Sequence, residues 1–433
     1  MKVRSAHSVQ GIVRLPGDKS ISHRAAMLAS IATGETRIEN FATSADCAST
    51  VACMQSLGVD IIHDDVMVRV RGVGKNGLRR PSAALNCGNS GTTMRLLAGI
   101  LAGQRFESEL FGDESLNLRP MKRIIVPLTM MGADINGSDG YPPLRINATG
   151  ALNAIEYFPE VASAQIKSCI MLAGLYADGV SSVTEKTSTR DHTERMLRWF
   201  GVDVGEIETF PGKSVQISGD AILTAHDLQI PSDISSAAFF ITAAACLIGS
   251  DITLSGIGLN GSRTAVLDVL SRFGADIGID GLREESNEPV GDIHVIGGGW
   301  LSSQGRQNVL DGKIIANLID EVPILAVAGT QINGGLEIRD AGELRVKESD
   351  RIAAIVENLR RMNAIVEEFP DGFRVERSQL IGAPVDSFGD HRIAMAFAIA
   401  GLFAAGETEI LGPEAVDVSF PGFFETLESI VIR

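Results

Sequence analysis

Aromatic side chains are scarce in this sequence, since Phe, Trp and Tyr together make up 5% of the 433 residues. This disfavours a surface built from stacked rings and favours close-packed helix and sheet layers, because small and aliphatic residues are plentiful. Basic residues are also outnumbered, with 38 Lys and Arg against 54 Asp and Glu and a formal net charge of −16. An acidic surface repels nucleic acid and anionic membranes, so neither is an expected partner.

Cysteines and long apolar runs are few as well. Five cysteines occur without CxxC spacing or the pattern of a disulfide framework: Cys47, Cys53, Cys87, Cys169 and Cys246. Their scatter favours a reducing cytoplasm, and no signal peptide is expected. The histidines show no metal-ligand spacing such as HExxH. The longest apolar runs, 237–249 and 393–406, fall short of the roughly 18 residues that a membrane span needs, so we expect buried helices there.

Two nucleotide-binding patterns carry little weight here. The phosphate-binding GxxxxGK[ST] motif is absent, which disfavours a P-loop phosphotransferase, and GxSxG is absent too. Residues 256–261 match GxGxxG, but they fall at a strand-to-helix joint that the other repeats use without such a pattern. A nucleotide site is therefore not expected at this position.

An internal repeat organises the chain. A helix of small apolar residues is expected to end at a glycine six times, each suited to the left-handed position after a helix: Gly34, Gly103, Gly179, Gly249, Gly329 and Gly406. A strand should follow each glycine, at 35–41, 105–111, 180–184, 251–254, 335–338 and 407–411. A second, amphipathic helix then ends in a recurring signature at Gly58, Gly132, Gly201 and Gly274, with Asn363 in a degraded fifth copy. The fixed order of the two markers predicts an α/β fold built from six similar units.

The stretch LPGDKSISHR at 15–24 shows how these units begin. A strand at 10–15 leads through a Pro-Gly turn into a helix at 21–33, with Asp18 or Ser20 as its N-cap. The cations Lys19 and Arg24 lie at a helix start, where the helix dipole disfavours positive charge. Such an arrangement is favourable where an anion is bound.

Basic residues recur at the expected helix starts: Lys19, Arg119, Arg190, Lys347, Arg351 and Arg392. Pro120 is expected as the first residue of its helix. If the starts face one cleft, their cations and dipoles together would bind small, multiply charged anions. Carboxylates lie among them at Asp320, Glu321, Glu348, Asp350 and Asp390, and both ion pairing and acid–base catalysis remain open for these groups.

Five long motifs together resemble the enolpyruvyl transferase family from end to end of the chain. They are LPGDKSISHR at 15–24, GNSGTTMR at 88–95, LRPM at 118–121, RVKESDR at 345–351 and GDHR at 389–392. The resemblance implies a two-domain inside-out α/β barrel of six βαβαββ-type repeats, three in each domain. The expected domains are 18–230 and a discontinuous one made of 1–17 and 231–433, which close on the substrate.

The resemblance further implies the reaction. The enolpyruvyl group of phosphoenolpyruvate would move to the 5-hydroxyl of shikimate 3-phosphate with release of phosphate, by addition and elimination, with neither a metal nor a cofactor. Shikimate 3-phosphate would be bound by Lys19, Ser20, Arg24, Ser163, Ala164, Gln165, Arg190, Asp320 and Lys347. Phosphoenolpyruvate would be bound by Lys19, Asn89, Gly91, Arg119, Gln165, Arg351 and Arg392. Asp320 would act as base, Glu348 as acid, and Lys19 would assist phosphate departure. A cytoplasmic monomer is expected.

Three features depart from many relatives. Ala164 replaces a second Ser, Val418 stands where some members have a phosphate-binding Lys, and the RxHxE element at 190–194 resembles the class II branch. We therefore expect weakened binding of the inhibitor glyphosate despite Gly91. Two alternatives remain: the related enzyme acting on UDP-N-acetylglucosamine, whose usual reactive Cys is replaced here by Glu114, and a noncatalytic anion-binding protein.

Overall fold

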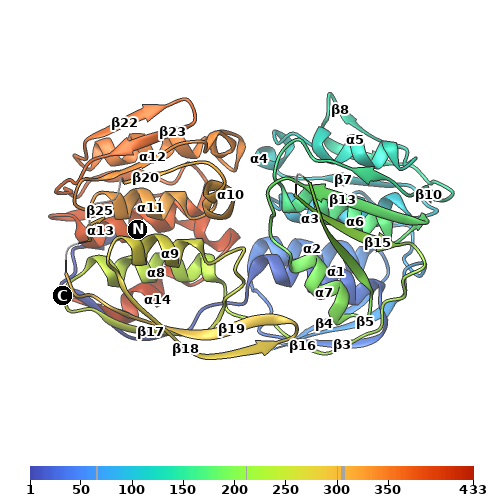
Figure 1. Ribbon diagram of the computed structural model, residues 1–433, viewed down its shortest axis with the longest axis horizontal. Coiled ribbons are helices and arrows are strands. Elements are labelled where there is room, and N and C mark those ends of the chain that lie inside the picture. Colours follow the sequence, from blue (N-terminus) through green and yellow to red (C-terminus); the bar gives the residue numbers. More distant parts are fainter. Residues whose placement is uncertain (65–66, 211, 300, 304–307) are drawn as a thin grey trace. The chain divides into compact units, whose positions relative to one another are not determined.

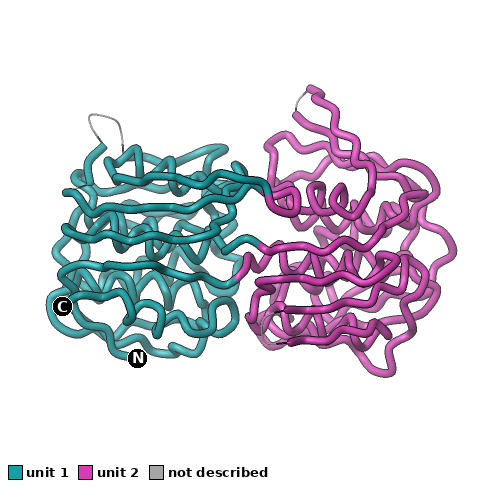
Figure 2. Tube along the Cα trace, turned by 90° about the horizontal axis from the view of Figure 1, so that it is seen from below, with its two compact units in different colours: residues 1–16, 231–284, 289–433 teal, residues 17–230, 285–288 magenta. Residues whose placement is uncertain are grey.

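The computed structural model describes residues 1–64, 67–210, 212–299, 301–303 and 308–433. Its chain forms two compact units, coloured separately in Figure 2. Unit 1 comprises Met1–Pro16, Pro231–Glu284 and Pro289–Arg433, and unit 2 comprises Gly17–Ile230 and Glu285–Glu288. Each unit has its own hydrophobic core, so each is organised around separate buried side chains.

Unit 2 contains three four-stranded sheets with one shared order, in which a parallel pair is extended by an antiparallel hairpin (Figure 1). The first sheet is β16 (Leu228–Gln229), β3 (Thr33–Glu39), β5 (Met67–Val73) and β4 (Asp60–Asp64). The second is β6 (Leu85–Asn86), β7 (Ser108–Phe111), β9 (Tyr141–Ile146) and β8 (Ile135–Ser138). The third is β11 (Glu156–Tyr157), β13 (Val180–Glu185), β15 (Gly212–Ser218) and β14 (Val204–Thr209). A parallel pair, β10 (Leu152–Asn153) and β12 (Ala177–Asp178), is separate.

Unit 1 repeats this order with additions from the chain ends. One sheet is β18 (Asp276–Glu285), β19 (Glu288–Ile296), β17 (Asp251–Gly258), β2 (Ser8–Val13) and β26 (Val431–Ile432). The next is β20 (Val309–Leu310), β21 (Leu336–Ile338), β23 (Gly372–Val375) and β22 (Val366–Phe369). The last is β1 (Lys2–Arg4), β25 (Glu407–Leu411) and β24 (Pro384–Asp386). The N-terminal strands therefore complete sheets of unit 1.

The helices alternate as predicted between two types. First-type helices consist mainly of small apolar residues, and second-type helices are amphipathic. The helices of unit 2 are α1 (Lys19–Ile31), α2 (Ala45–Ser56), α3 (Gly91–Ala102), α4 (Glu114–Asn117), α5 (Lys122–Met130), α6 (Ala164–Gly174) and α7 (His192–Trp199). Those of unit 1 are α8 (Ile234–Cys246), α9 (Ala265–Arg272), α10 (Ile314–Leu318), α11 (Val322–Gly329), α12 (Arg351–Arg361), α13 (His391–Phe403) and α14 (Phe423–Ile430), with 3-10 helices η1 (Gly342–Val346) and η2 (Pro413–Val418).

The first-type helices are buried on almost every side. In unit 1, α8, α11 and α13 pack against one another, as Figure 1 shows. Strand β9, in contrast, alternates exposed and buried residues, which is the pattern of a sheet with one face in solvent. Helices therefore lie inside and sheets outside, as an inside-out α/β barrel requires. Across the described ranges, no helix combines the length and apolar character needed to cross a membrane.

The second-type helices confirm the recurring signature. The second residue after each of five helices is left-handed: Gly58, Gly132, Gly201, Gly274 and Asn363. Each donates its N–H to the carbonyl three residues earlier, and the next residue donates to the carbonyl five residues earlier. This is the Schellman motif, which satisfies carbonyls at a helix end. Asn363 adopts the same conformation as the glycines, so the fifth copy is degraded in sequence but not in geometry.

Several predicted boundaries are wrong. Helix α1 begins at Lys19 rather than residue 21, and β3 begins before Gly34, which therefore lies inside a strand. Strand β2 ends at Val13 rather than residue 15. Gly103 has φ −90° and Gly329 is the last residue of α11, so neither is left-handed. These two glycines permit close packing instead, because a Cβ would lie 2.3 Å from Tyr176 and 2.5 Å from Val375, respectively.

Two other local predictions have clear outcomes. Pro120 does not begin a helix, because α4 ends at Asn117, Arg119 N–H bonds the Leu116 carbonyl, and α5 starts only at Lys122. The first half of the GxGxxG stretch, 256–258, lies in β17, where Gly256 has φ +65° within an irregularity of the strand pairing. The two apolar runs form the buried helices α8 and α13, as predicted.

Candidate active site

Each first-type helix begins after a polar or acidic residue, and α1 begins two residues earlier than predicted. Their N-cap residues are Asp18, Ser90, Ser163, Asp233, Glu321 and Asp390. Asp18 rather than Ser20 caps α1, since its carboxylate accepts a hydrogen bond from Ile21 N–H at 2.8 Å. Ser163 makes no capping hydrogen bond with its side chain. Its half-buried hydroxyl therefore remains suited to a ligand at this helix start.

Lys19 is the first residue of α1 and is held against the start of α2. Its Nζ lies 3.0 Å from Asp46 Oδ2, and both side chains are mostly buried. Ser20 follows on the same turn and is half-buried. The pair fixes the ammonium group at the two helix starts while leaving part of it accessible.

Arg24 lies one turn further into α1 and joins three helices. Its guanidinium donates to Thr193 Oγ1 on α7 at 2.7 Å, to Ser168 Oγ on α6 at 2.8 Å and to the Ser20 carbonyl at 2.8 Å. These three acceptors are neutral groups, and together they fix the orientation of the guanidinium. Arg24 is only 4% exposed, which places it beneath the helix starts rather than on the surface.

Gly91 begins α3 in direct contact with two guanidinium groups. A Cβ at this position would lie 2.9 Å from Arg95 Nη1 and 3.4 Å from Arg119 Nη1. Arg119 donates to Asn89 Oδ1 at 2.7 Å, and Arg95 donates to Gln165 Oε1 at 2.6 Å. Four predicted ligand-binding residues thus lie together near the starts of α3 and α6: Asn89, Gly91, Arg119 and Gln165. Arg95, which was not predicted, lies beside them.

The remaining predicted residues of unit 2 flank these helix starts. Ala164 is the first residue of α6, directly before Gln165, whose amide also donates to Thr92 Oγ1 at 3.0 Å. Arg190 is half-buried two residues before α7. Thr193 of α7 accepts from Arg24 of α1 and shares a hydrogen bond with Ser168 of α6, so α7 is tied to both helices. The starts of unit 2 therefore form one connected network.

The positive charge of this network affects the pKa of His23. His23 lies between Lys19 and Arg24 in α1, is fully buried, and shares a 2.7 Å hydrogen bond through Nδ1 with Thr50. Burial, followed by the charges of Lys19 and Arg24, lowers the pKa of His23 well below its usual value. The imidazole is consequently neutral at physiological pH.

The helix starts of unit 1 are centred on Arg351, which is 1% exposed. Its guanidinium donates to Asp390 Oδ2 at 2.7 Å, to Glu348 Oε2 at 2.7 Å and, at 3.5 Å, to Asp320 Oδ1. Burial opposes the charged form of Arg351, but these three carboxylates outweigh it and raise the pKa of the guanidinium. One cation thus holds both predicted proton-transfer groups, Asp320 and Glu348.

Arg392 lies on α13 beside the same carboxylates. It donates to the Asp320 carbonyl at 2.7 Å, and its guanidinium lies 3.6 Å from Glu321 Oε1. Glu321 is itself hydrogen-bonded by Ser235 of α8. Lys347 stands at the end of η1 with its Nζ 3.9 Å from Glu343, and a quarter of its side chain is exposed. Asp320, Glu348, Arg351 and Arg392 of unit 1 therefore form one connected group, while Lys347 pairs with Glu343 after η1.

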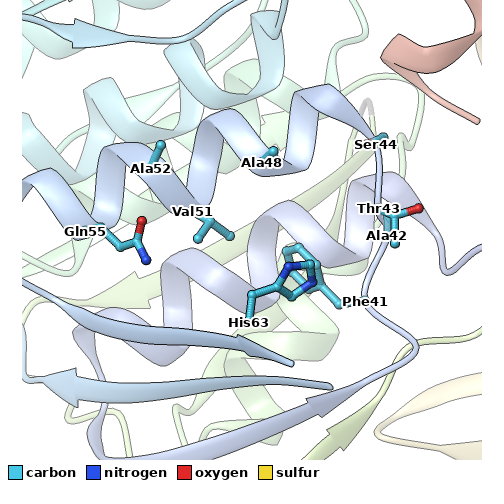
Figure 3. Close-up of a pocket in the computed structure, with 9 residues that line it drawn as sticks. All are labelled: Phe41, Ala42, Thr43, Ser44, Ala48, Val51, Ala52, Gln55 and His63. Atoms are coloured by element: carbon cyan, nitrogen blue, oxygen red, sulfur yellow. The ribbon is translucent and has the colours of Figure 1, made fainter. Parts of the chain in front are cut away.

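A cavity of about 130 Å³ lies elsewhere in unit 2, against one side of α2 (Figure 3). Its lining is mainly apolar and includes Phe41, Val51 and Ala52, with Gln55 and His63 as polar members. None of the predicted ligand-binding residues lines it. The cavity is therefore not the candidate site.

The sequence analysis missed three charged residues that organise unit 2. Asp46 fixes Lys19, Arg95 fixes Gln165, and Lys167 of α6 bonds Glu185 and Glu194 at 2.8 and 2.7 Å. A usable signal was present for the last two, because each is a lone cation in an otherwise apolar helix. Such a charge requires a buried partner.

Comparison with known proteins gives one consistent result. The family model described as EPSP synthase (3-phosphoshikimate 1-carboxyvinyltransferase) matches residues 3–427. The 3-phosphoshikimate 1-carboxyvinyltransferase of Solibacter usitatus is 50% identical over 431 residues, covering 99% of each chain. That of Geobacillus thermodenitrificans is 49% identical over 429 residues, covering 98% of this chain and 97% of the relative.

Solved structures agree with the sequence comparisons. The EPSP synthase of Acinetobacter baumannii superposes with a TM-score of 0.87 at 41% identity, covering 99% of this chain and 97% of that chain. A second structure of EPSP synthase from Acinetobacter baumannii gives a TM-score of 0.86 at 40% identity, with coverage of 100% and 98%. The similarity extends over both units.

Proposed function

The chain belongs to the EPSP synthase family, and we propose that the helix starts of its two units divide the work of that family's reaction. The reaction transfers the enolpyruvyl group of phosphoenolpyruvate to shikimate 3-phosphate in the shikimate pathway. The acceptor oxygen is the 5-hydroxyl, and inorganic phosphate is released. The observation that carries the assignment is the match over the whole chain, because it includes every predicted site residue.

Unit 2 supplies most of the groups that bind shikimate 3-phosphate. Lys19, Ser20, Arg24, Ser163, Gln165 and Arg190 provide cations and hydrogen-bond donors, and Ala164 contributes backbone. A phosphate is favoured at the starts of α1 and α6, where free N–H groups and positive dipole ends are available. Lys347 and Asp320 of unit 1 complete this set in the proposal.

Phosphoenolpyruvate is assigned to arginines of both units. Arg119, with Asn89 and Gly91, binds from unit 2, while Arg351 and Arg392 bind from unit 1. Guanidinium forks suit the phosphate and the carboxylate of this substrate. Gln165 and Lys19 are assigned to both substrates. Gly91 has no Cβ, so phosphoenolpyruvate can approach the backbone closely there.

Proton transfer is assigned to the carboxylates that Arg351 holds. Asp320 takes the proton from the 5-hydroxyl, whose oxygen then bonds to C2 of phosphoenolpyruvate, while Glu348 delivers a proton to the methylene carbon. The resulting tetrahedral intermediate loses phosphate and a proton from its methyl group, which restores the enol ether. Lys19 stabilises the departing phosphate. Both carboxylates contact the guanidinium of Arg351. Protonation of one of them therefore changes how strongly this guanidinium stabilises the charge of the other.

Phosphate release tests the function against its alternatives. The purified chain should release phosphate from phosphoenolpyruvate when shikimate 3-phosphate is added, and not when UDP-N-acetylglucosamine is added instead. The second acceptor is disfavoured because Glu114, the first residue of α4, stands where that enzyme usually has a reactive Cys. Phosphate release with the nucleotide sugar alone would overturn the assignment, and release with neither acceptor would favour a noncatalytic protein. We expect a cytoplasmic monomer.

A further inference from the structure

The RxHxE element at 190–194 contains more buried contacts than substrate binding requires. Only Arg190 is assigned to substrate, whereas His192, Thr193 and Glu194 are each at most 2% exposed. His192 pairs through Nδ1 with Glu288 at 2.7 Å, and Thr193 accepts from Arg24. Glu194 contacts Lys167 of α6. The three buried members therefore anchor the start of α7 at three separate points.

Lys167 is the centre of the third anchor. Its Nζ lies 2.8 Å from Glu185 Oε2 and 2.7 Å from Glu194 Oε1, and all three side chains are no more than 4% exposed. Burial alone would lower the pKa of Lys167, but Glu194 and Glu185 outweigh it and raise that pKa. The cluster thus holds one cation between two carboxylates in a place that water does not reach.

The cluster joins three segments that carry the proposed shikimate 3-phosphate ligands. Lys167 lies in α6, one turn after the N-cap Ser163 and two residues after Gln165. Glu185 ends β13 and accepts from Thr189 N–H at 3.3 Å and from its hydroxyl, which fixes the residue before Arg190. Glu194 holds α7 itself. A shift of Lys167 would consequently move Ser163 and Gln165 at the start of α6 relative to Arg190.

We propose that Lys167, Glu185 and Glu194 form a positioning cluster that sets the affinity for shikimate 3-phosphate by fixing Arg190 against the start of α6. This rests on the proposed function of that site. The cluster does not touch substrate. Its role is to hold two carboxylates at one ammonium group, because buried carboxylates without the cation repel each other and displace the segments that carry them.

Lys167→Met is the variant that tests this. It should raise KM for shikimate 3-phosphate about tenfold or more, since broken buried ion pairs have effects of that size or larger. KM for phosphoenolpyruvate should change far less. The defect should also depend on pH, because protonation of one of the two carboxylates relieves their repulsion. KM of the variant for shikimate 3-phosphate should therefore fall toward the wild-type value as pH is lowered.

Neighbouring charges do not produce this pH dependence. The elements packed around the cluster carry further titratable or charged groups. They are Lys19, His23 and Arg24 of α1, Arg95 of α3, Lys122 and Arg123 of α5, His192, Arg195 and Arg198 of α7, Glu156 and Tyr157 of β11, Glu206 and Glu208 of β14 and Lys213 of β15. All are present in wild type and variant alike. The ratio of the variant's KM for shikimate 3-phosphate to the wild-type KM at each pH therefore isolates the effect of the cluster.

A rescue variant separates positioning from loss of folding. Lys167→Met combined with Glu194→Gln removes the repelling pair, so KM for shikimate 3-phosphate should recover and lose its pH dependence. Glu206→Gln is the matched control, because Glu206 pairs with Arg198 at the other end of α7 at 2.6 Å and is 29% exposed. It should leave both KM values unchanged. Thermal unfolding of each variant reports the folded fraction.

The outcomes are distinguishable. If wild type releases no phosphate with shikimate 3-phosphate, the proposed function fails and the cluster has no reaction to serve. If wild type is active, a Lys167→Met enzyme with a lower Tm but an unchanged KM overturns the positioning role. Equal rises in KM for both substrates, or a defect that neither low pH nor Glu194→Gln relieves, would overturn it too.

Discussion

The helix starts of the two units use arginine in opposite ways. In unit 2, Arg24 donates to two hydroxyls and a carbonyl, and Arg95 and Arg119 donate to side-chain amides. In unit 1, Arg351 donates to three carboxylates. A neutral acceptor orients a guanidinium without bringing a negative charge to it, whereas a carboxylate also pairs with its charge. From this comparison we propose that unit 2 contributes mainly to anion binding and that the carboxylates held by Arg351 in unit 1 contribute to proton transfer.

Removing the central arginine of unit 1 should have the largest effect. Arg351→Met leaves Asp320, Glu348 and Asp390 without their shared cation, so we expect loss of about 3–5 kcal/mol of unfolding free energy, as for other broken buried pairs, and loss of turnover. Chemical denaturation and phosphate release measure the two effects. Arg361→Met is the control on the same helix, since Arg361 pairs with Glu357 at the surface. It should cost about 0.5 kcal/mol or less.

The proton-transfer groups of unit 1 should affect turnover more than binding. Asp320→Asn and Glu348→Gln each keep a hydrogen-bonding group but cannot exchange the proton, so kcat should fall about 10²- to 10⁴-fold with KM changed only slightly. Steady-state kinetics with both substrates checks this. Glu337→Gln in β21, whose carboxylate pairs with Arg339, should be kinetically silent. Unchanged turnover in both site variants would remove their assigned roles.

How far the sequence predicts this arrangement depends on the distance between the partners. The N-cap residues and the five Schellman motifs follow from local patterns, so all were predictable from a few neighbouring residues. Arg24, however, bonds Ser168 and Thr193, which lie 144 and 169 residues away in the chain. Those pairings depend on how the repeats pack. The charge inventory was therefore predictable, while the difference between neutral and acidic partners was not.

A Cβ at Gly91 should perturb the anion side at smaller cost. Gly91→Ala places its methyl group against the guanidinium groups of Arg95 and Arg119. Displacing them by a few tenths of an ångström should raise KM for phosphoenolpyruvate about three- to tenfold, equivalent to roughly 1 kcal/mol, with kcat nearly unchanged. Initial rates at varied phosphoenolpyruvate test this. Gly150→Ala meets no atom within 4 Å and serves as the control. An unaltered KM in Gly91→Ala would separate these arginines from that substrate.

The smallest expected effect concerns pH and unit 2. Because the pKa of His23 is lowered in the folded state, the unfolded chain binds an extra proton below about pH 6.5, and stability falls as pH falls through that value. The slope due to His23 is at most about 1.4 kcal/mol per pH unit. Urea unfolding at pH 7.5, 6.5 and 5.5 measures it. His23→Asn, which retains a partner for Thr50, should show a shallower decline, and an equally steep one would assign the effect to other groups.

The affinity for shikimate 3-phosphate alone, measured by isothermal titration calorimetry on Arg24→Met and Asp320→Asn, tests the division of roles most directly. Arg24→Met should weaken binding about tenfold or more, because it removes a buried cation from the proposed anion site. Asp320→Asn should bind within about threefold of wild type while turning over poorly. Weaker binding by Asp320→Asn than by Arg24→Met would contradict the division between the two units.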